Sequence, residues 1–463
     1  MAVGTAGAGG GNTALAAHLK EAGCSNAALA RRVNELGALQ GEVTRYDKAS
    51  TTRWAQGVTP KGKTPQFIAE AVGGFLGRPV SPTDLGFPPQ AQRPVAARAL
   101  SYREDVSETL HTLAELGSTD ISRRRLLGAT PFIASALVDP QRQWLLWLLE
   151  EEQAPHLTSV AGGGPVEQVE AMINMFDLMD NRFGGGNVRP SIVGYLSTQL
   201  APMLQQRGLP ASQRRTLYVY AAKLAAMAGW CSYDTAEYGL AERYMIQALR
   251  LCAEGGDRVL GGQILAGLSH VATSLGNPAE GVALARAGIA TAKCSGSPLG
   301  LMRLHAMAAR GHAMLDTPRQ AAASLAAADA ALEQSRGPAE ESVWVRFLDH
   351  HYLEAEAALV HRDLGEATTA ERLAAASVAA NTDRRRRQAI SSSVLATAFL
   401  QQNRLDEAVG TASTALDLLG GVHSERSVQA LRDFRARLAP SRNEPIVRDF
   451  ERKARPILGA SAA

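Results

Sequence analysis

Aromatic residues are scarce in this chain of 463 residues: Phe, Trp and Tyr together account for 5%. Sustained runs of alternating β-branched residues bounded by turn pairs are missing too, which argues against a fold built on β-sheets. The four cysteines form no CxxC pair; they are Cys24, Cys231, Cys252 and Cys294. Their wide spacing argues against a zinc site or a disulfide framework and is typical of a protein in a reducing cytoplasm.

The sequence also lacks long apolar runs. The best candidate, Leu126 to Val138, is too short to span a bilayer. Residues 1–11 are rich in glycine and alanine and carry no positive side chain, so they lack the basic flank of a signal peptide. We therefore expect a soluble, cytoplasmic protein that begins with a flexible tail over residues 1–11.

Alanine, the strongest helix former, is abundant from residue 200 onward, which predicts an all-α fold. The chain is too long for a single hydrophobic core, so two or three domains are expected. Breaks rich in glycine and proline suggest the following divisions: a small helical domain over 12–88, a helical connector over 89–125, a helical bridging region over 126–211, helical repeats over 212–440 and a C-terminal tail over 441–463.

Turns recur in the second half of the chain at intervals of roughly 40 residues. They lie at Gly276-Asn277, Leu315-Asp316, Leu364-Gly365 and Gln402-Asn403, and each precedes an alanine-rich helix. A helical hairpin cannot bury its apolar stripe alone, so neighbouring hairpins stack into a superhelical α-solenoid. The pattern resembles tetratricopeptide (TPR) repeats, with Asn403–Leu416 as the best match, and predicts four to six units.

Local signals in residues 12–88 predict several short helices. Ser25 is a good N-cap for a helix over 26–34, and Asp47 can cap a helix over 48–56 that Gly57 ends. A further helix from Thr64 to Gly77 would direct five apolar side chains inward: Phe67, Ile68, Ala71, Phe75 and Leu76. Trp54 has the helical spacing of a core residue, and stacking on a base is the less common alternative.

Three segments of this domain, 28–34, 46–54 and 65–79, resemble an actinobacterial branch of the repressor-like (XRE/Cro) helix-turn-helix family. In that branch the domain precedes tetratricopeptide-like repeats, and its members look like regulators of differentiation and antibiotic production. The resemblance covers residues 12–87 well and the repeats loosely. It implies a transcriptional regulator that binds double-stranded DNA. No pairing of Ser or Cys with His and a carboxylate stands out, so an enzyme is not expected.

The resemblance further implies that residues 48–56 are the recognition helix in the major groove. The candidates for base contacts are Lys48, Ser50, Thr52, Arg53 and Gln56, and those for phosphate contacts are Asn26, Lys61 and Lys63. Residues 1–88 hold nine Lys and Arg against six Asp and Glu. Because this excess of charge is modest, we expect a homodimer whose two half-sites increase the affinity for DNA.

Aromatic residues cluster in two places within the repeats. Packing between helices is the commoner role for such residues, and contact with a peptide or small ligand in a concave groove is the alternative. The ligand candidates are Tyr220, Trp230, Tyr233 and Tyr238, followed by Trp344, Phe347 and His350. This groove is expected to sense a small molecule, a peptide or a protein partner.

Three further patterns favour structural roles. The runs at 123–125 and 384–387 consist of arginine and are expected to be solvated helix starts, the first with Asp120 or Ser122 as its N-cap. Adjacent histidines such as His350 and His351 are expected to point to different sides of a helix, so no metal site is predicted. No cofactor or catalytic group is expected either.

The alternative function is a TPR interaction scaffold without sequence-specific DNA binding.

Overall fold

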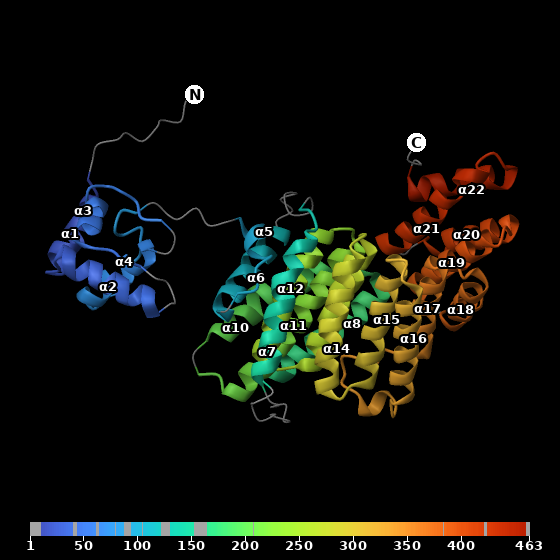
Figure 1. The fold of residues 1–463 in the computed structure, drawn as a ribbon, viewed down its shortest axis with the longest axis horizontal. Helices are drawn as coiled ribbons and strands as arrows, with labels where there is room; N and C mark the ends of the chain where they lie inside the picture. Colours follow the sequence, from blue (N-terminus) through green and yellow to red (C-terminus); the bar gives the residue numbers. More distant parts are fainter. Residues whose placement is uncertain are drawn as a thin grey trace. The chain divides into compact units, whose positions relative to one another are not determined.

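The computed structural model describes residues 11–39, 44–61, 64–78, 80–87, 94–103, 105–121, 130–151, 164–206, 208–382, 384–420 and 424–459. The chain divides into two compact units, residues 1–93 and 94–463. All regular secondary structure in these ranges is helical, which confirms the all-α prediction (Figure 1). None of the described helices has the length and apolar character needed to cross a membrane. The tail predicted over residues 1–11 lies almost entirely outside the described residues.

The described residues of the first unit form four helices: α1 (Thr13–Glu21), α2 (Asn26–Leu39), α3 (Lys48–Ala55) and α4 (Thr64–Leu76). Both predicted N-caps are confirmed. The Ser25 hydroxyl accepts a hydrogen bond from the Ala28 amide at 3.2 Å, and the Asp47 carboxylate accepts one from the Ser50 amide at 2.8 Å. The core includes Leu15, Leu29, Val33, Trp54, Phe67, Ile68, Leu85 and Phe87.

One inward position was predicted wrongly. Phe75 is 42% exposed because it lies in the last turn of α4, where the neighbouring Leu76 packs against the core instead. Phe67, Ile68 and Ala71 are buried as expected. Trp54 belongs to the core and lies edge-on to Tyr46 with 5.0 Å between the ring centroids.

The second unit is an array of helical hairpins that follow one another in chain order (Figure 1). Five hairpins are built from described residues: α11 (Ala211–Asp234) with α12 (Tyr238–Gly255), α13 (Arg258–Ser274) with α14 (Pro278–Ser295), α15 (Pro298–Met314) with α16 (Pro318–Glu333), α17 (His350–Asp363) with α18 (Ala367–Ala380), and α19 (Arg385–Gln401) with α20 (Leu405–Leu418). Each pairs with the next, as expected of a helical repeat array.

The five hairpins share one turn geometry. A residue with φ between 52° and 79° follows the first helix in each; these residues are Ala236, Gly276, Asp316, Gly365 and Asn403. The amide of the next residue donates to a carbonyl five positions earlier, for example from Glu237 to Ser232 at 2.9 Å. This bond is the signature of the Schellman motif, which satisfies the carbonyls at a helix end. The turns predicted near residues 276, 316, 365 and 403 are confirmed.

Only one interval between these turns is much longer than 40 residues. Between Asp316 and Gly365 the chain inserts residues 334–349, which join α16 to α17 and contain the short helix η3 (Pro338–Glu340). We call residues 334–349 the insertion.

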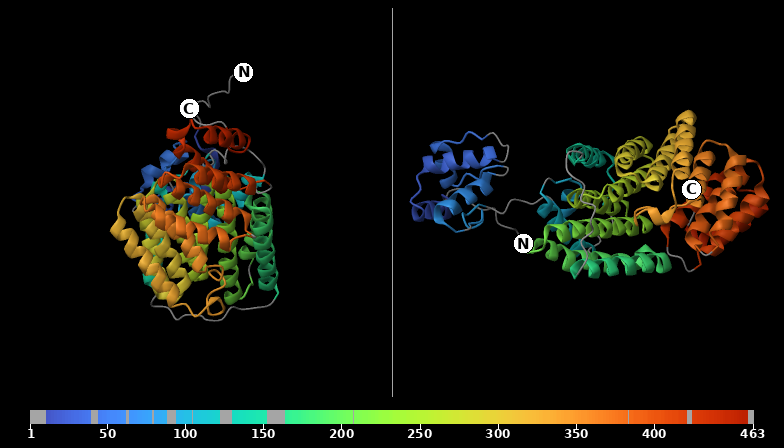
Figure 2. Two further views of the ribbon diagram at one scale, coloured as in Figure 1. Left: turned by 90° about the vertical axis from the view of Figure 1, so that its right-hand side faces the viewer. Right: turned by 90° about the horizontal axis from the view of Figure 1, so that it is seen from below.

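Further helices extend and cover the array (Figure 2). On the N-terminal side lie α5 (Val95–Arg98), α6 (Val106–Ile121), η1 (Ala134–Leu137), α7 (Val138–Glu151), α8 (Pro165–Phe183), α9 (Gly185–Tyr195), the π-helix η2 (Leu196–Leu200) and α10 (Ala201–Gln205); on the C-terminal side lie α21 (Glu425–Arg437), η4 (Ala439–Ser441) and α22 (Pro445–Leu458). Helices α6 and α7 contact α12, whereas α8 and α9 contact α11. The segment expected to be a connector over 89–125 therefore contributes α5 and α6 to the second unit.

The segment expected to be a C-terminal tail also needs correction. Residues 445–458 form α22, which contacts α20. Val447, Phe450, Ala454 and Leu458 are buried there, because their spacing places them on one side of a helix.

Helix α7 is fixed across α13 and α14 by a single large side chain. The Trp144 indole is fully buried and donates a 2.9 Å hydrogen bond to Thr291. Its ring lies against Gly261, where an added Cβ would be 2.1 Å from the nearest ring atom. Glycine is therefore required at this position for the indole to pack.

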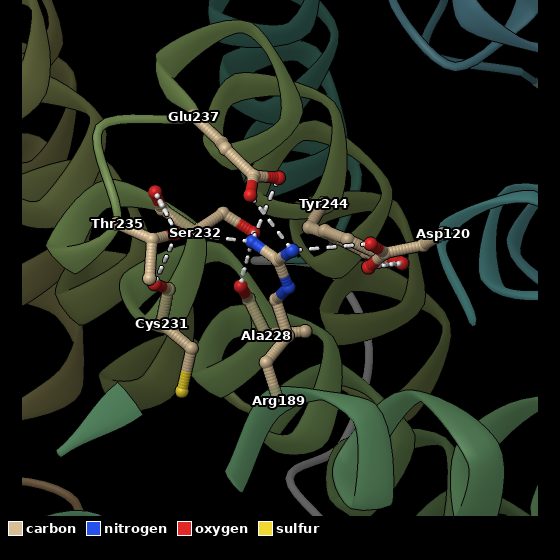
Figure 3. Close-up of polar contacts among 8 residues, drawn as sticks. All are labelled: Asp120, Arg189, Ala228, Cys231, Ser232, Thr235, Glu237 and Tyr244. Atoms are coloured by element: carbon tan, nitrogen blue, oxygen red, sulfur yellow. Dashed lines mark hydrogen bonds and ion pairs between the residues drawn. The ribbon is translucent and has the colours of Figure 1, made fainter. Parts of the chain in front are cut away.

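A partly buried ionic network joins α6, α9, α11 and α12. The Arg189 guanidinium lies between the carboxylates of Asp120 and Glu237, at 3.2 and 2.9 Å (Figure 3). It also donates to Ser232 and Thr235. Asp120 was expected to cap a following helix, but it lies in the last turn of α6 and turns inward to Arg189; the arginine run 123–125 and Ser122 lie outside the described residues.

Candidate functional site

Side chains in the first unit tie the start of α2 to α3. The Thr51 hydroxyl donates to the Asn26 carbonyl at 3.0 Å, and the Asn26 amide group donates to the Thr52 hydroxyl at 3.1 Å. The segment before α3 is held by Asn34, which accepts from the Tyr46 amide at 2.9 Å and donates to its carbonyl at 2.8 Å. These contacts fix the orientation of α3 relative to α2.

Three of the predicted base-contacting residues are exposed: Lys48 and Arg53 on α3, and Gln56 at its end. Thr52 is half-buried and donates to the Lys48 carbonyl at 2.8 Å. Ser50 is different, because it is buried and donates to Asp47 at 2.7 Å within a capping box. Hydrogen bonds from Ser50 hold the pKa of Asp47 below its usual value.

The predicted phosphate contacts are only partly placed. Asn26 is half-buried and already bonded to Thr52, which leaves little of its amide for a phosphate. Lys61 is exposed beyond the end of α3, whereas Lys63 lies outside the described residues.

The second unit encloses a groove of about 2440 Å³. Its walls come from α8 and from the first helix of each hairpin: α11, α13, α15, α17 and α19, with α21 at the end and the insertion contributing Trp344 and Phe347. The second helices of the first two hairpins, α12 and α14, contact α7.

The groove lining follows the repeat. The position 13 residues before the left-handed turn residue is occupied in successive hairpins by Lys223, Gln263, Arg303, Tyr352 and Ile390, and all five line the groove. The position six residues before it is occupied by Trp230, His270, Arg310 and Leu359, which line it as well. The two positions lie seven residues apart, close to two helical turns, and so share one face.

Neighbouring hairpins make contacts between these equivalent positions. Arg303 donates to Gln263 at 2.6 Å, and Arg310 donates to His270 at 2.9 Å. The rings of Trp230 and His270 lie 5.6 Å apart. Burial and the neighbouring arginines 310, 426 and 303 hold the pKa of His270 well below its usual value, so the imidazole is neutral and accepts the hydrogen bond from Arg310.

Six of the seven predicted ligand contacts line the groove: Tyr220, Trp230, Tyr233, Tyr238, Trp344 and Phe347. His350 is exposed and is not part of the lining. Tyr220 and Tyr233 are buried, so packing accounts for most of their surface, whereas Phe347 is 50% exposed.

Two side chains of the insertion, Glu341 and Trp344, hold it against the start of α15 and of α13. Glu341 accepts hydrogen bonds from the Ser297 hydroxyl at 2.7 Å and the Leu299 amide at 3.0 Å, at the start of α15. Trp344 donates to Asp257, the N-cap of α13, at 2.7 Å. The insertion thereby places Trp344 and Phe347 along the groove.

Trp230 lies among arginines contributed by distant helices. The guanidinium carbons of Arg303 and Arg426 each lie 5.7 Å from its ring centroid. Arg426 lies 5.6 Å from the Tyr233 ring as well and forms an ion pair with Asp234. Such cation–π contacts are stronger where the cation is desolvated.

The arginine run at the start of α19 is not uniformly solvated, which corrects the prediction for two of its members. Arg384 and Arg385 are exposed, as expected. Arg386 forms an ion pair with Asp234 at 2.7 Å, and Arg387 lies 5.9 Å from the ring centroid of Tyr352. All four arginines belong to the groove lining; the difference is that Arg386 and Arg387 contact side chains of α11 and α17.

The groove lining carries an excess of positive charge: 13 Lys and Arg against nine Asp and Glu. Arg310 pairs with Glu356 at 3.3 Å, and Asp234 is shared by Arg386 and Arg426. Arg303 and Arg387 have no carboxylate within ion-pair distance among the described residues, and each keeps a buried N–H without an acceptor there.

His350 and His351 do not point apart as expected, because their ring centroids are 3.7 Å from each other at the first turn of α17. Together with Glu354 they offer ligand atoms within 4.8 Å of one another. His351 already contacts Glu354 at 3.1 Å, and the histidines lie at the partly exposed helix start.

Sequence reasoning missed the arginines at the centre of the groove. A signal was available: no Lys, Arg, Asp or Glu other than Arg303 and Arg310 occurs in the sequence from Leu299 to Ala313. Charged groups are rarely buried without a partner, so such positions point to a polar site inside the array. Aligning the turns would have placed both arginines at the groove face.

Comparison with protein families finds that residues 15–88 match the model of the SP15 N-terminal domain. The match spans most of the first unit and well under half of the chain. A comparison with curated proteins found no match.

Proposed function

We propose that this chain is a DNA-binding transcriptional regulator. In this proposal α3 enters the major groove of duplex DNA, and the helical array resembles tetratricopeptide repeats, mediates dimerisation and senses a small-molecule or peptide signal or a protein partner. The observation that carries the proposal is the two-sided character of α3: Thr51 and Trp54 face the core, while Lys48, Arg53 and Gln56 are exposed. A helix held this way can present its outer face to base edges.

Sensing requires that the signal bind two arrangements of the homodimer with different affinities. The groove is suited to this role because it combines aromatic surface with charged groups from five successive hairpins. A signal held there would contact several repeats at once, and a change in their packing is a physical means of altering the spacing of two DNA-binding domains.

The alternative is an interaction scaffold whose array binds a protein partner and whose first unit does not recognise a DNA sequence. The modest charge of residues 1–88, nine Lys and Arg against six Asp and Glu, favours this second candidate.

Selection of bound fragments from genomic DNA, carried out with the full chain at two salt concentrations, separates the two candidates. A recurring motif with inverted half-sites, retained at the higher salt concentration, is the expected result for a regulator. Fragments of random sequence that are lost when salt is added would contradict it, because phosphate contacts alone carry no sequence preference.

A further inference from the structure

The centre of the groove contains buried positive charge that the protein itself does not neutralise. Arg303 is 7% exposed, and its Nε has no hydrogen-bond acceptor; the same is true of one terminal nitrogen of Arg387. Burying a guanidinium without its full set of acceptors is unfavourable, and an anion bound in the groove would supply the missing acceptors.

Tyr352 connects these two arginines. The Arg387 guanidinium lies over the Tyr352 ring, and Arg303 lies close enough to the hydroxyl to lower its pKa. Burial outweighs that effect and raises the pKa of Tyr352 to about 12. The hydroxyl therefore keeps its proton at neutral pH and can donate a hydrogen bond to an anion.

The start of α19 adds a second, independent observation. Arg385, Arg386 and Arg387 occupy its first turn, and Arg384 is its N-cap residue. Cations at a helix N-terminus are unfavourable because they lie beside the positive end of the helix dipole, where acidic residues are preferred. Burial and the neighbouring Arg384 lower the pKa of Arg387, which reflects the same unfavourable concentration of charge. An anion at this place would relieve it.

Flat aromatic surface lies next to this charge. Arg303 contacts both the Trp230 and the Phe347 rings, at 5.7 and 5.8 Å from its guanidinium carbon. The Phe347 side chain is half exposed within the groove lining. A planar group could stack in this region while an attached anionic group reaches the arginines.

We infer that the groove binds a small organic dianion, in which a phosphate monoester or a pair of carboxylates is held by Arg303, Arg387 and Tyr352 and an attached flat ring lies against Trp230 and Phe347. Two guanidinium groups and a hydroxyl favour a doubly charged head group over a single carboxylate, because forked donors match phosphate and carboxylate oxygens. The inference specifies the signal class for the sensing role proposed above and rests on that role, but its test does not involve DNA.

Isothermal titration calorimetry on the full chain tests the inference with four probes: 1-naphthyl phosphate, naphthalene-2,3-dicarboxylate, 1-naphthol and inorganic phosphate. We expect one of the two aromatic dianions to bind, with naphthol and inorganic phosphate binding much more weakly because each lacks half of the recognised group. The first two probes distinguish a phosphate from a dicarboxylate ligand. If neither aromatic dianion binds at millimolar concentration, or if naphthol binds equally well, the inference is wrong.

Three variants localise the site. Arg303→Gln and Arg387→Gln should each weaken binding of the aromatic dianion about 10- to 100-fold, as expected for the loss of a charged hydrogen-bond donor. Arg319→Gln is the control, because it removes the same charge from an exposed position on α16 outside the groove lining, and should change Kd less than about threefold. Equal weakening in all three variants would show non-specific attraction to positive charge and would overturn the site.

Thermal unfolding without ligand establishes that the variants are folded. Should Arg387→Gln fail to fold, Arg387→Lys keeps the charge but loses the forked donor, and the site predicts weakened binding for it as well. Undiminished binding by Arg387→Lys together with undiminished binding by Arg303→Gln would exclude these residues as the anion site. If the native full chain binds the aromatic dianion but selects no DNA motif, the proposed function is contradicted and the inference is not.

Discussion

The indole of Trp344 donates a 2.7 Å hydrogen bond to the carboxylate of Asp257, a residue 87 positions earlier in the chain. Asp257 also caps α13 by accepting from the Leu260 amide at 2.8 Å. One carboxylate therefore caps the start of a helix and anchors the insertion that brings aromatic side chains to the groove. Burial raises the pKa of Asp257, and the hydrogen bonds from Leu260 and Trp344 oppose that rise.

Arg53→Ala tests the proposed role of α3 as the recognition helix. We expect the affinity for a selected DNA sequence to fall by about 1–3 kcal/mol if Arg53 contacts a base, with less effect on unrelated DNA. Fluorescence anisotropy with labelled duplexes measures both affinities. Lys20→Ala is the control, because Lys20 is an exposed cation in the last turn of α1. Equal losses for the two variants would mean that Arg53 contributes only general attraction.

Removal of residues 1–93 tests the independence of the second unit. Residues 94–463 have their own buried core, and repeats contact mainly their neighbours, so the truncated protein should keep its helical circular dichroism signal and a cooperative thermal transition. A broad transition without cooperativity would show that the array needs the first unit to fold.

Ala236→Gly tests the shared turn. Ala236 has φ of 60°, a conformation that costs an alanine about 1 kcal/mol and a glycine much less, so the substitution should raise the free energy of unfolding by about 0.5–1 kcal/mol. Gly276→Ala is the reciprocal control, because it has φ of 79° and an added Cβ would contact nothing within 4 Å. Urea unfolding should show opposite signs for the two variants; equal signs would contradict the turn geometry.

Glu242→Gln tests a pH dependence of stability. Burial raises the pKa of Glu242 to about 7, while the Ile133 amide and Arg243 oppose that rise; one carboxylate oxygen has no hydrogen-bond partner among the described residues. The folded state binds the proton of Glu242 more tightly than the unfolded state does, so protonation of Glu242 stabilises the fold. This stabilisation is greatest below the unfolded pKa of 4.5 and is lost as pH rises toward 7.

The variant should therefore be more stable than the native protein at pH 8, by up to about 3 kcal/mol, and the difference should shrink toward pH 5. Urea unfolding at several pH values measures this trend. Glu333→Gln removes an exposed carboxylate on α16 and should leave the pH profile unchanged. A difference between Glu242→Gln and the native protein that is constant from pH 5 to 8 would rule out titration of Glu242 as its cause.

Local features of the fold could be predicted from the sequence because their causes lie within a few residues. The N-caps Ser25 and Asp47 each act on an amide three positions later, and the turns at Gly276 and Gly365 need only a residue that tolerates positive φ. The all-helical class followed from composition for the same reason.

Features that depend on distant packing could not be predicted. Trp144 needs Gly261 for space and Thr291 as a hydrogen-bond acceptor, and no local pattern links positions more than 100 residues apart. The aromatic residues of the groove were found because they stand out in a chain poor in aromatics. Arg303 escaped notice and Arg387 was assigned to a solvated run, because their role appears only once α15 and α19 lie along one groove.

The geometry of the hairpins and part of the aromatic lining of the groove come from different parts of the chain: the uniform turns and the insertion. The left-handed residue and its hydrogen bond recur in all five hairpins, so they set how the two helices within each hairpin meet. Trp344 and Phe347 belong to a segment outside that pattern. Evolution or an engineer could therefore exchange the segment between α16 and α17 to change what the groove recognises, while the turn inside each hairpin is inherited unaltered.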